Sequence, residues 1–170
     1  MKPFIIVLLF LPGVENYAYS QSFCKEVCAY AFQRSELPGM IADVENTAIQ
    51  SAIDTSYFIY LEQPSGIHLS ADEIWIKGDG FIIAKMELEQ TPVVVNYSLT
   101  GSTIRSDTLI RKKATTVYRL YKGKKIGQPA PTRFRTIVHS NDVVIFYKVK
   151  STYYFTSLRK LTTIESIAFQ

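Results

Sequence analysis

The chain has 170 residues with a formal net charge of +4 at pH 7, and 47% of its residues are hydrophobic. This composition excludes an intrinsically disordered chain, and the length corresponds to about one domain with its own core. No apolar stretch approaches the ~20 residues that a membrane-spanning helix requires, so we expect no transmembrane span in the mature chain.

Residues 1–20 have the features of an export signal. Lys2 supplies a positive start, Phe4 to Leu11 form a short apolar run, and Ala18 and Ser20 have a small-residue spacing suited to cleavage before Gln21. We therefore expect a secreted or periplasmic protein whose mature chain is one domain. In that domain a helical segment, residues 21–55, precedes a β domain, residues 56–170.

Two cysteines follow directly after the predicted cleavage point. Because Cys24 and Cys28 are an even pair in an exported chain, a disulfide between them is the first expectation, and free thiols are the alternative. Two cysteines with no histidine nearby give only two of the four ligands that zinc requires. We expect no metal and no cofactor.

The N-terminal part of the mature chain favours helix. Residues 21–35 are predicted to form a short helix or arm that Pro38-Gly39 ends. From Met40 to Ile53 the apolar residues recur at helical spacing, which predicts an amphipathic helix that packs on a sheet.

Strands are predicted for most of the remaining chain, because aromatic and β-branched residues there alternate between turn signals. The expected strands are Tyr57–Glu62, the two arms of a hairpin within Glu73–Glu89, Val93–Leu99, Thr108–Arg111, Thr115–Tyr121, Phe134–His139, Val143–Lys150 and Tyr153–Leu158. Gly127–Pro131 is a predicted loop, and the tail from Arg159 is compatible with either a helix or a strand.

The Glu73–Glu89 hairpin is the expected centre of the sheet. A two-residue loop would scatter its apolar residues over both faces. A three-residue loop, Gly78–Gly80, instead places on one face Ile74, Ile76, Ile82, Ala84, Met86 and Leu88. On that register Trp75, Phe81 and Ile83 share the other face. This patch is either covered by another element or serves as a binding surface.

Taken together, the pattern predicts a mainly β (α+β) fold: an antiparallel sheet, sandwich-like or barrel-like, with one or two helices near the N-terminus.

Charge is distributed unevenly along the chain. Residues 36–90 hold ten acidic and two basic side chains, and residues 108–135 hold nine basic side chains and no acidic one. Such asymmetry is typical either of solvated strand faces or of a surface for an anionic partner. The candidate binding residues are Arg119, Lys122, Lys124 and Lys125, the last three in a predicted turn at Lys122–Lys125.

No catalytic motif stands out. His68 and His139 lack the spacing of a metal site, and there is no GxSxG, Walker or GxGxxG pattern. Nucleic acid is not an expected partner, since an exported chain rarely meets it and no recognisable binding motif is present.

A resemblance concerns the segments Tyr57–Glu62, Ile74–Gly78 and Thr91–Val95. They are similar to a pattern in small uncharacterised secreted proteins of Bacteroidetes-type Gram-negative bacteria, and the signal ending before Gln21 resembles their export signals. The resemblance implies a periplasmic or surface location, and it implies no activity and no functional residues.

The sequence therefore favours an exported, non-enzymatic binding domain whose partner is a protein or an anionic envelope component. The alternative is a hydrolase or small-molecule binder whose site is assembled from distant residues. Assembly through an exposed edge strand is a third reading, and the sequence does not give the oligomeric state.

Overall fold

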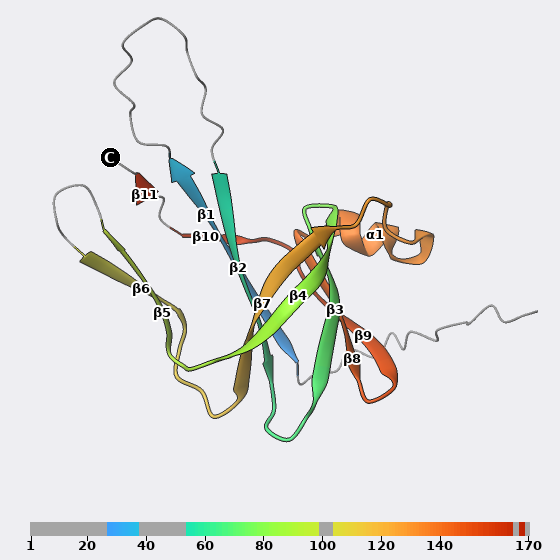
Figure 1. Cartoon of the computed structure of the whole chain (residues 1–170), viewed down its shortest axis with the longest axis horizontal. Coiled ribbons are helices and arrows are strands. Elements are labelled where there is room, and N and C mark those ends of the chain that lie inside the picture. The colour runs from blue at the N-terminus through green and yellow to red at the C-terminus, as the bar shows by residue number, and fades with distance from the viewer. Residues whose placement is uncertain (1–26, 38–53, 99–103, 165–166, 169–170) are drawn as a thin grey trace, which may run out of the picture.

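The computed structural model describes residues 27–37, 54–98, 104–164 and 167–168, and these form a mainly β fold (Figure 1). The strands are β1 (Cys28–Leu37), β2 (Asp54–Gln63), β3 (Leu69–Ile76), β4 (Asp79–Glu89), β5 (Val93–Ser98), β6 (Ile104–Ile110), β7 (Thr116–Lys125), β8 (Val143–Val149), β9 (Thr152–Leu158), β10 (Thr162–Thr163) and β11 (Ile167–Ala168). Among the described residues the only helix is α1 (Thr132–Ser140).

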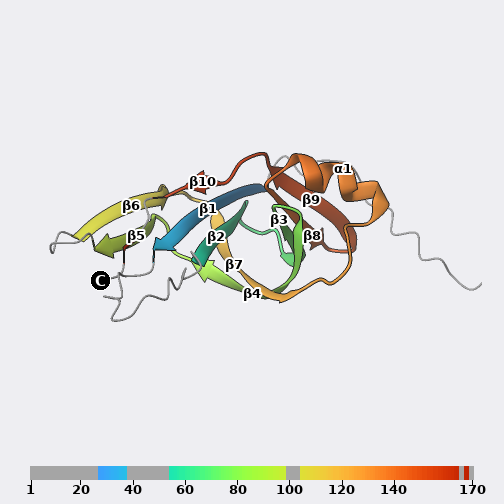
Figure 2. The same ribbon diagram turned by 90° about the horizontal axis from the view of Figure 1, so that it is seen from above.

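Most strands belong to one curled sheet with the order β10-β1-β2-β7-β4-β3-β8-β9. Its neighbours are antiparallel, except that β10 and β11 pair with β1 in parallel. After β9 the chain crosses to β10 beside β1, so that the two ends of the sheet approach each other and form a half-barrel (Figure 2). Strands β5 and β6 form a separate two-stranded arm.

The inner face of the half-barrel carries the main core. Alternate residues point inward, including Ile59 and Leu61 of β2, Ile74 of β3, and Ile145 and Tyr147 of β8. Strand β8, between β3 and β9, is buried on both faces from Val143 to Tyr147, which explains its continuous apolar sequence.

Two elements cover the outer face of the sheet. Helix α1 packs Phe134 and Val138 against Trp75 of β3 and Phe146 of β8. The β5–β6 arm places Val93 and Ile110 on Phe32, Tyr60 and Val117, which are outward residues of β1, β2 and β7.

The strand predictions at Tyr57–Glu62, Val143–Lys150 and Tyr153–Leu158 are confirmed within β2, β8 and β9. The predicted strand Thr115–Tyr121 is also confirmed as the first part of β7.

The prediction of helices near the N-terminus is wrong for the described residues there. Residues 28–35 belong to β1, in which the small side chains of Ala29 and Ala31 point inward and the aromatic rings of Tyr30 and Phe32 point outward. This period-two pattern fits a strand with neighbours on both sides. The amphipathic helix predicted at residues 40–53 lies outside the described residues.

The single described helix occurs where a strand, Phe134–His139, was predicted. Phe134 and Val138 are four residues apart and both are buried on one side, which is helical spacing. The β-branched residues of the segment had favoured a strand, but the contact with Trp75 selects the helix.

The three-residue hairpin loop is also wrong. Ile76 pairs with Asp79, so the loop is the two residues Lys77 and Gly78, with φ angles of 51° and 88°. Two positive φ values are characteristic of a type I′ turn. Irregularities in β4 on either side of Ile83 shift the register and return Met86 to the inner face. A regular two-residue hairpin would have placed Met86 on the opposite face, and this was the reason for predicting the longer loop.

The predicted turn Lys122–Lys125 is instead the end of β7 and pairs with β4. Gly123 serves close packing, because a Cβ there would lie 3.0 Å from the Cβ of Ala84 and 3.1 Å from the carbonyl oxygen of Ile82. The glycine therefore accommodates the irregular part of β4.

Candidate functional site

A hollow of about 490 Å³ forms where β2 and β7 separate. The two strands pair from Ile59 opposite Leu120 to Gln63 opposite Thr116, and beyond Ile59 they are no longer paired. We call this site the arginine hollow. It is lined by Arg34, Thr55, Ser56, Tyr57, Phe58, Arg119, Leu120, Tyr121 and Lys122, from β1, β2 and β7.

Arg119 is the central side chain of the arginine hollow. Its guanidinium lies 5.4 Å from the ring centre of Phe58 and 4.9 Å from that of Tyr121. Arg34 reaches the ring of Phe58 from β1, at 5.1 Å. Contacts of this kind are cation–π interactions, and they restrict the position of the guanidinium.

Glu87 of β4 is the residue that pairs with Arg119 of β7, but the carboxylate of Glu87 contacts other side chains. Lys85 lies 3.1 Å from its oxygen, and the hydroxyl of Tyr121 donates to it. The hydrogen bond from Lys85, followed by that from Tyr121, lowers the pKa of Glu87, so this carboxylate is ionised and committed to these partners. Within the described part of the chain, Arg119 forms no ion pair and no side-chain hydrogen bond.

The hollow extends toward the inner face through Lys122 and Tyr57. The ammonium of Lys122 lies 5.1 Å from the ring centre of Tyr57 and 5.4 Å from that of Phe81. Burial raises the pKa of Tyr57, and the carboxylates of Asp79 and Asp142 raise it further, so its hydroxyl stays protonated. It can therefore donate a hydrogen bond to an acceptor.

These groups together are suited to binding an anion. The Arg119 guanidinium lies over two rings and makes no side-chain hydrogen bond to the described residues, so its N–H groups are available for the paired oxygens of carboxylate, sulfate and phosphate groups. The side chain is half-buried, so a charged hydrogen bond made here is less weakened by water than one at an open surface.

The structure brings some predicted binding residues together and separates others. Arg119 and Lys122 both line the arginine hollow. Lys124 and Lys125 lie farther along β7, and Lys125 pairs with Asp79 at 2.9 Å.

The predicted Trp75-Phe81-Ile83 patch does not form one surface. Trp75 is 3% exposed beneath helix α1, whereas Phe81 and Ile83 pack on the inner core. The two-residue hairpin loop places Trp75 opposite Gly80 and so on the other side of the sheet from Phe81.

The predicted disulfide is not formed in the structure. Cys28 has a free, exposed thiol, and Cys24 lies outside the described residues.

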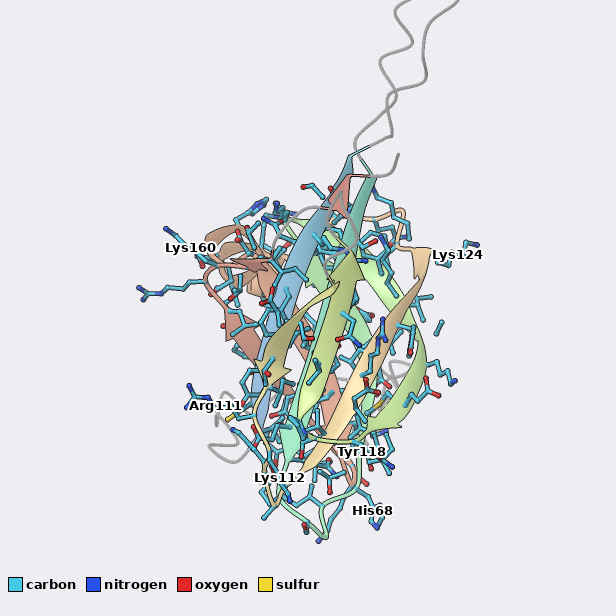
Figure 3. All side chains as sticks on the ribbon, turned by 90° about the vertical axis from the view of Figure 1, so that its left-hand side faces the viewer. His68, Arg111, Lys112, Tyr118, Lys124 and Lys160 are labelled. Atoms are coloured by element: carbon cyan, nitrogen blue, oxygen red, sulfur yellow. The ribbon has the colours of Figure 1, made fainter. Side chains whose placement is uncertain are left out.

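The histidines do not meet in one cleft. His68 is exposed at the lower end of the sheet in Figure 3, and His139 is exposed on helix α1, which lies in the upper part of Figure 1. In the described ranges no three His, Cys, Asp or Glu side chains are grouped as metal ligands.

Sequence reasoning missed Arg34 and Phe58, which complete the arginine hollow. It also missed a polar cluster in which Glu62 of β2 accepts hydrogen bonds from Lys113 at 2.7 Å, from Thr115 at 2.6 Å and from the hydroxyl of Tyr30. A carboxylate at the end of the apolar run Tyr57–Leu61 was the available signal, since a buried charge requires partners.

This polar cluster fixes the base of the β5–β6 arm. Lys113 belongs to the segment that returns from β6 to β7, and its backbone N–H also donates to the hydroxyl of Thr91 at 3.2 Å. Because Thr91 precedes β5, the contacts tie both ends of the arm to β2.

Within the described residues, no helix has the length and apolar character needed to cross a bilayer. Comparison with protein-family models, with curated proteins and with solved structures gives no match to this chain.

Proposed function

We propose that the protein is an exported, non-enzymatic binding domain that takes an anionic component of the cell envelope or extracellular space into the arginine hollow. The ligand group is a carboxylate, sulfate or phosphate on a molecule with the dimensions of a small saccharide, since ligand sites of a few hundred Å³ accept molecules of this size.

The observation that carries this proposal is the state of Arg119. Its guanidinium makes cation–π contacts with Phe58 and Tyr121, lines a hollow, and has no ion pair among the described residues. The position of the group is fixed by its neighbours before any ligand arrives, and a preorganised donor loses less entropy on binding.

Calorimetric titration with a heparin-derived disulfated disaccharide tests the proposal. Arg119→Gln should weaken the affinity by about tenfold or more, because a hydrogen bond to a charged group contributes about 1.5–3 kcal/mol. Arg119→Lys keeps the charge but loses the forked donors, so its affinity should fall between the two.

Arg111→Gln is the matched control. Arg111 is exposed at the lower end of the molecule and is not among the residues that line the arginine hollow, and its replacement removes the same charge (Figure 3). The control should bind as the wild type does. Equal affinities of Arg119→Gln and wild type, or equal losses in both variants, would contradict a site at Arg119.

Export is the other part of the proposal, and it is supported by the sequence of residues 1–20 alone. Mass spectrometry of the protein from its native cells should give a mature N-terminus at Gln21. A protein that retains Met1 and stays in the cytoplasm would contradict export but would leave the binding site untouched.

A further inference from the structure

One end of the half-barrel gathers segments that are distant in the sequence. The N–H of Lys77 in the β3–β4 turn donates to the carbonyl of Asp142 at 2.7 Å, and the N–H of Asp142 donates to that of Arg159 at 3.3 Å. On the other side of the turn, the N–H of Ile126, just after β7, donates to the carbonyl of Gly80 at 2.7 Å. The end of β7, the end of α1 and the chain after β9 therefore meet around one turn.

The side chains of these segments are mainly cationic. We call this surface the basic pole, and it consists of Lys77, Lys124, Lys125, Arg135, Arg159 and Lys160, all of them exposed. Figure 3 shows Lys124 and Lys160 on opposite sides of the upper end, whereas Arg111 and Lys112 lie at the lower end.

Two carboxylates lie in the same segments, and both have partners. Asp79 pairs with Lys125 at 2.9 Å, and Oδ2 of Asp142 accepts the N–H of Leu161 at 2.9 Å. Most of the positive charge at the basic pole is therefore not neutralised by the described residues around it. A surface of this kind attracts anions over about a Debye length, ~8 Å at physiological ionic strength.

The basic pole is continuous with the arginine hollow. Strand β7 carries Arg119 and Lys122 at the hollow and then Lys124 and Lys125 at the pole. Six residues of extended chain from Arg119 to Lys125 span about 20 Å. Lys77, at the pole, also donates to the side-chain oxygen of Gln33, the neighbour of Arg34, at 2.8 Å.

From this continuity we infer that the ligand is a linear acidic polysaccharide. One anionic group of the chain occupies the arginine hollow and further groups contact the basic pole. This inference rests on the proposed function, and it adds that the partner is a polymer rather than an isolated small anion. The basic side chains of β7 are spread over about 20 Å, which exceeds what a single small saccharide can contact.

The character of the surface favours a polysaccharide over a lipid bilayer. The largely exposed large apolar side chains among the described residues are Ile82, Leu88 and Val94, on β4 and β5. Of these three, Ile82 borders the basic pole, beside Gly123 of β7, so a single exposed large apolar side chain accompanies the basic residues there. Proteins that bind the membrane surface usually insert apolar side chains next to their basic residues.

The contacts of the aromatic rings at the arginine hollow favour a polysaccharide over a single-stranded nucleic acid. The rings at the arginine hollow are already covered by cations: Phe58 by Arg34 and Arg119, and Tyr57 by Lys122. Bases would need such rings as stacking platforms.

The test compares two double variants that each remove two exposed positive charges. Lys124→Gln/Lys160→Gln alters the basic pole, and Arg111→Gln/Lys112→Gln alters the lower end (Figure 3). Each is titrated with the heparin disaccharide, with a heparin dodecasaccharide, and with vesicles that contain phosphatidylglycerol, over a series of salt concentrations.

We expect the wild type to bind the dodecasaccharide more tightly than the disaccharide and to bind the vesicles least. The pole variant should lose about tenfold in dodecasaccharide affinity, with a shallower salt dependence, because fewer counterions are displaced. Its disaccharide affinity should be unchanged, and the lower-end variant should match the wild type with both saccharides.

Equal losses in the two double variants would mean that net charge alone attracts the polymer, and this would overturn the inference. Tighter binding to vesicles than to the dodecasaccharide would overturn it in favour of a bilayer. If Arg119→Gln fails to weaken disaccharide binding, the proposed function fails. If it weakens that binding while the pole variant behaves as wild type with the dodecasaccharide, only the polymer inference fails.

Discussion

Glu62 shows how a single buried charge organises its surroundings. The carboxylate is 8% exposed and is held by Lys113, Thr115 and Tyr30, which come from three different parts of the chain. Burial by itself would raise the pKa of Glu62, but the hydrogen bonds from these three groups together lower it. Its bond to Lys113, foremost, raises the pKa of that ammonium, so both groups remain charged.

Replacing Glu62 with Gln should therefore destabilise the protein. Loss of a partner from a fully buried ion pair costs about 3–5 kcal/mol, and partial exposure of Lys113 reduces the expected loss to about 1–3 kcal/mol. Urea denaturation measures this difference. Asp72→Asn, at an exposed position of β3, is the control and should change stability by less than about 0.5 kcal/mol. A Glu62→Gln variant as stable as the control would contradict the anchoring role.

The stability difference between the wild type and Glu62→Gln should also depend on pH. Because the pKa of Glu62 is lower in the folded state than its ordinary value of 4.5, the stabilisation is complete above that value and is lost as pH falls through the folded-state pKa. The difference in melting temperature between wild type and Glu62→Gln should thus be constant near neutral pH and shrink below pH 4.5. A difference that grows on acidification would show that the sign is wrong.

The residues of the arginine hollow were only partly predictable. Arg119 and Lys122 could be selected because the sequence concentrates basic residues between positions 108 and 135. Arg34 and Phe58 could not, since they join the site only through the pairing of β1 with β2 and the separation of β2 from β7. Pairing between strands far apart in sequence leaves no signal at the individual positions.

At the scale of elements, the β3–β4 hairpin depends on its turn. Gly78 has a φ of 88°, and a Cβ there would meet nothing within 4 Å. A side chain at this position is therefore disfavoured by the positive φ and not by a steric clash. Gly78→Ala should cost about 1–2 kcal/mol. Gly127→Ala is the control, because Gly127 is also in open space and lacks a positive φ. Equal melting temperatures for the two variants would contradict a left-handed turn at Gly78.

The packing of helix α1 on Trp75 is a second contact that should contribute to stability. Phe134→Ala should destabilise the protein by about 3 kcal/mol, because a buried aromatic ring is lost from a packed cluster. The chain has one tryptophan, so its fluorescence reports on this contact, and the emission should shift to longer wavelength as water reaches Trp75. Arg135→Ala, on the exposed side of α1, should leave the emission unchanged. An unshifted spectrum in Phe134→Ala would mean that α1 does not shield Trp75.

Elements were predictable where one periodicity dominated. Strand β8 is an unbroken apolar run and β9 is rich in aromatic residues, and both were found from the sequence. Helix α1 was missed because its β-branched residues obscured the spacing of Phe134 and Val138, and the hairpin loop was mistaken because the irregular part of β4 changes the register after the turn. These outcomes were determined by contacts between elements rather than by local preference.

For the whole molecule, the mainly β class followed from the number and spacing of short apolar segments, but the curl of the sheet did not. The curl depends on the passage from β9 to β10 beside β1, at positions where the sequence allowed either a helix or a strand. This curl is what places the chain after β9 next to the β3–β4 turn and so forms the basic pole. The binding surface is therefore a property of the assembled half-barrel.

The most direct test of the account is an NMR titration that follows the arginine side-chain Nε–Hε signals as the heparin disaccharide is added. The account predicts a large, saturable shift for Arg119, a smaller one for its neighbour Arg34, and almost none for Arg111. Shifts confined to exposed arginines such as Arg111 and Arg159, with Arg119 unmoved, would contradict the arginine hollow as the binding site.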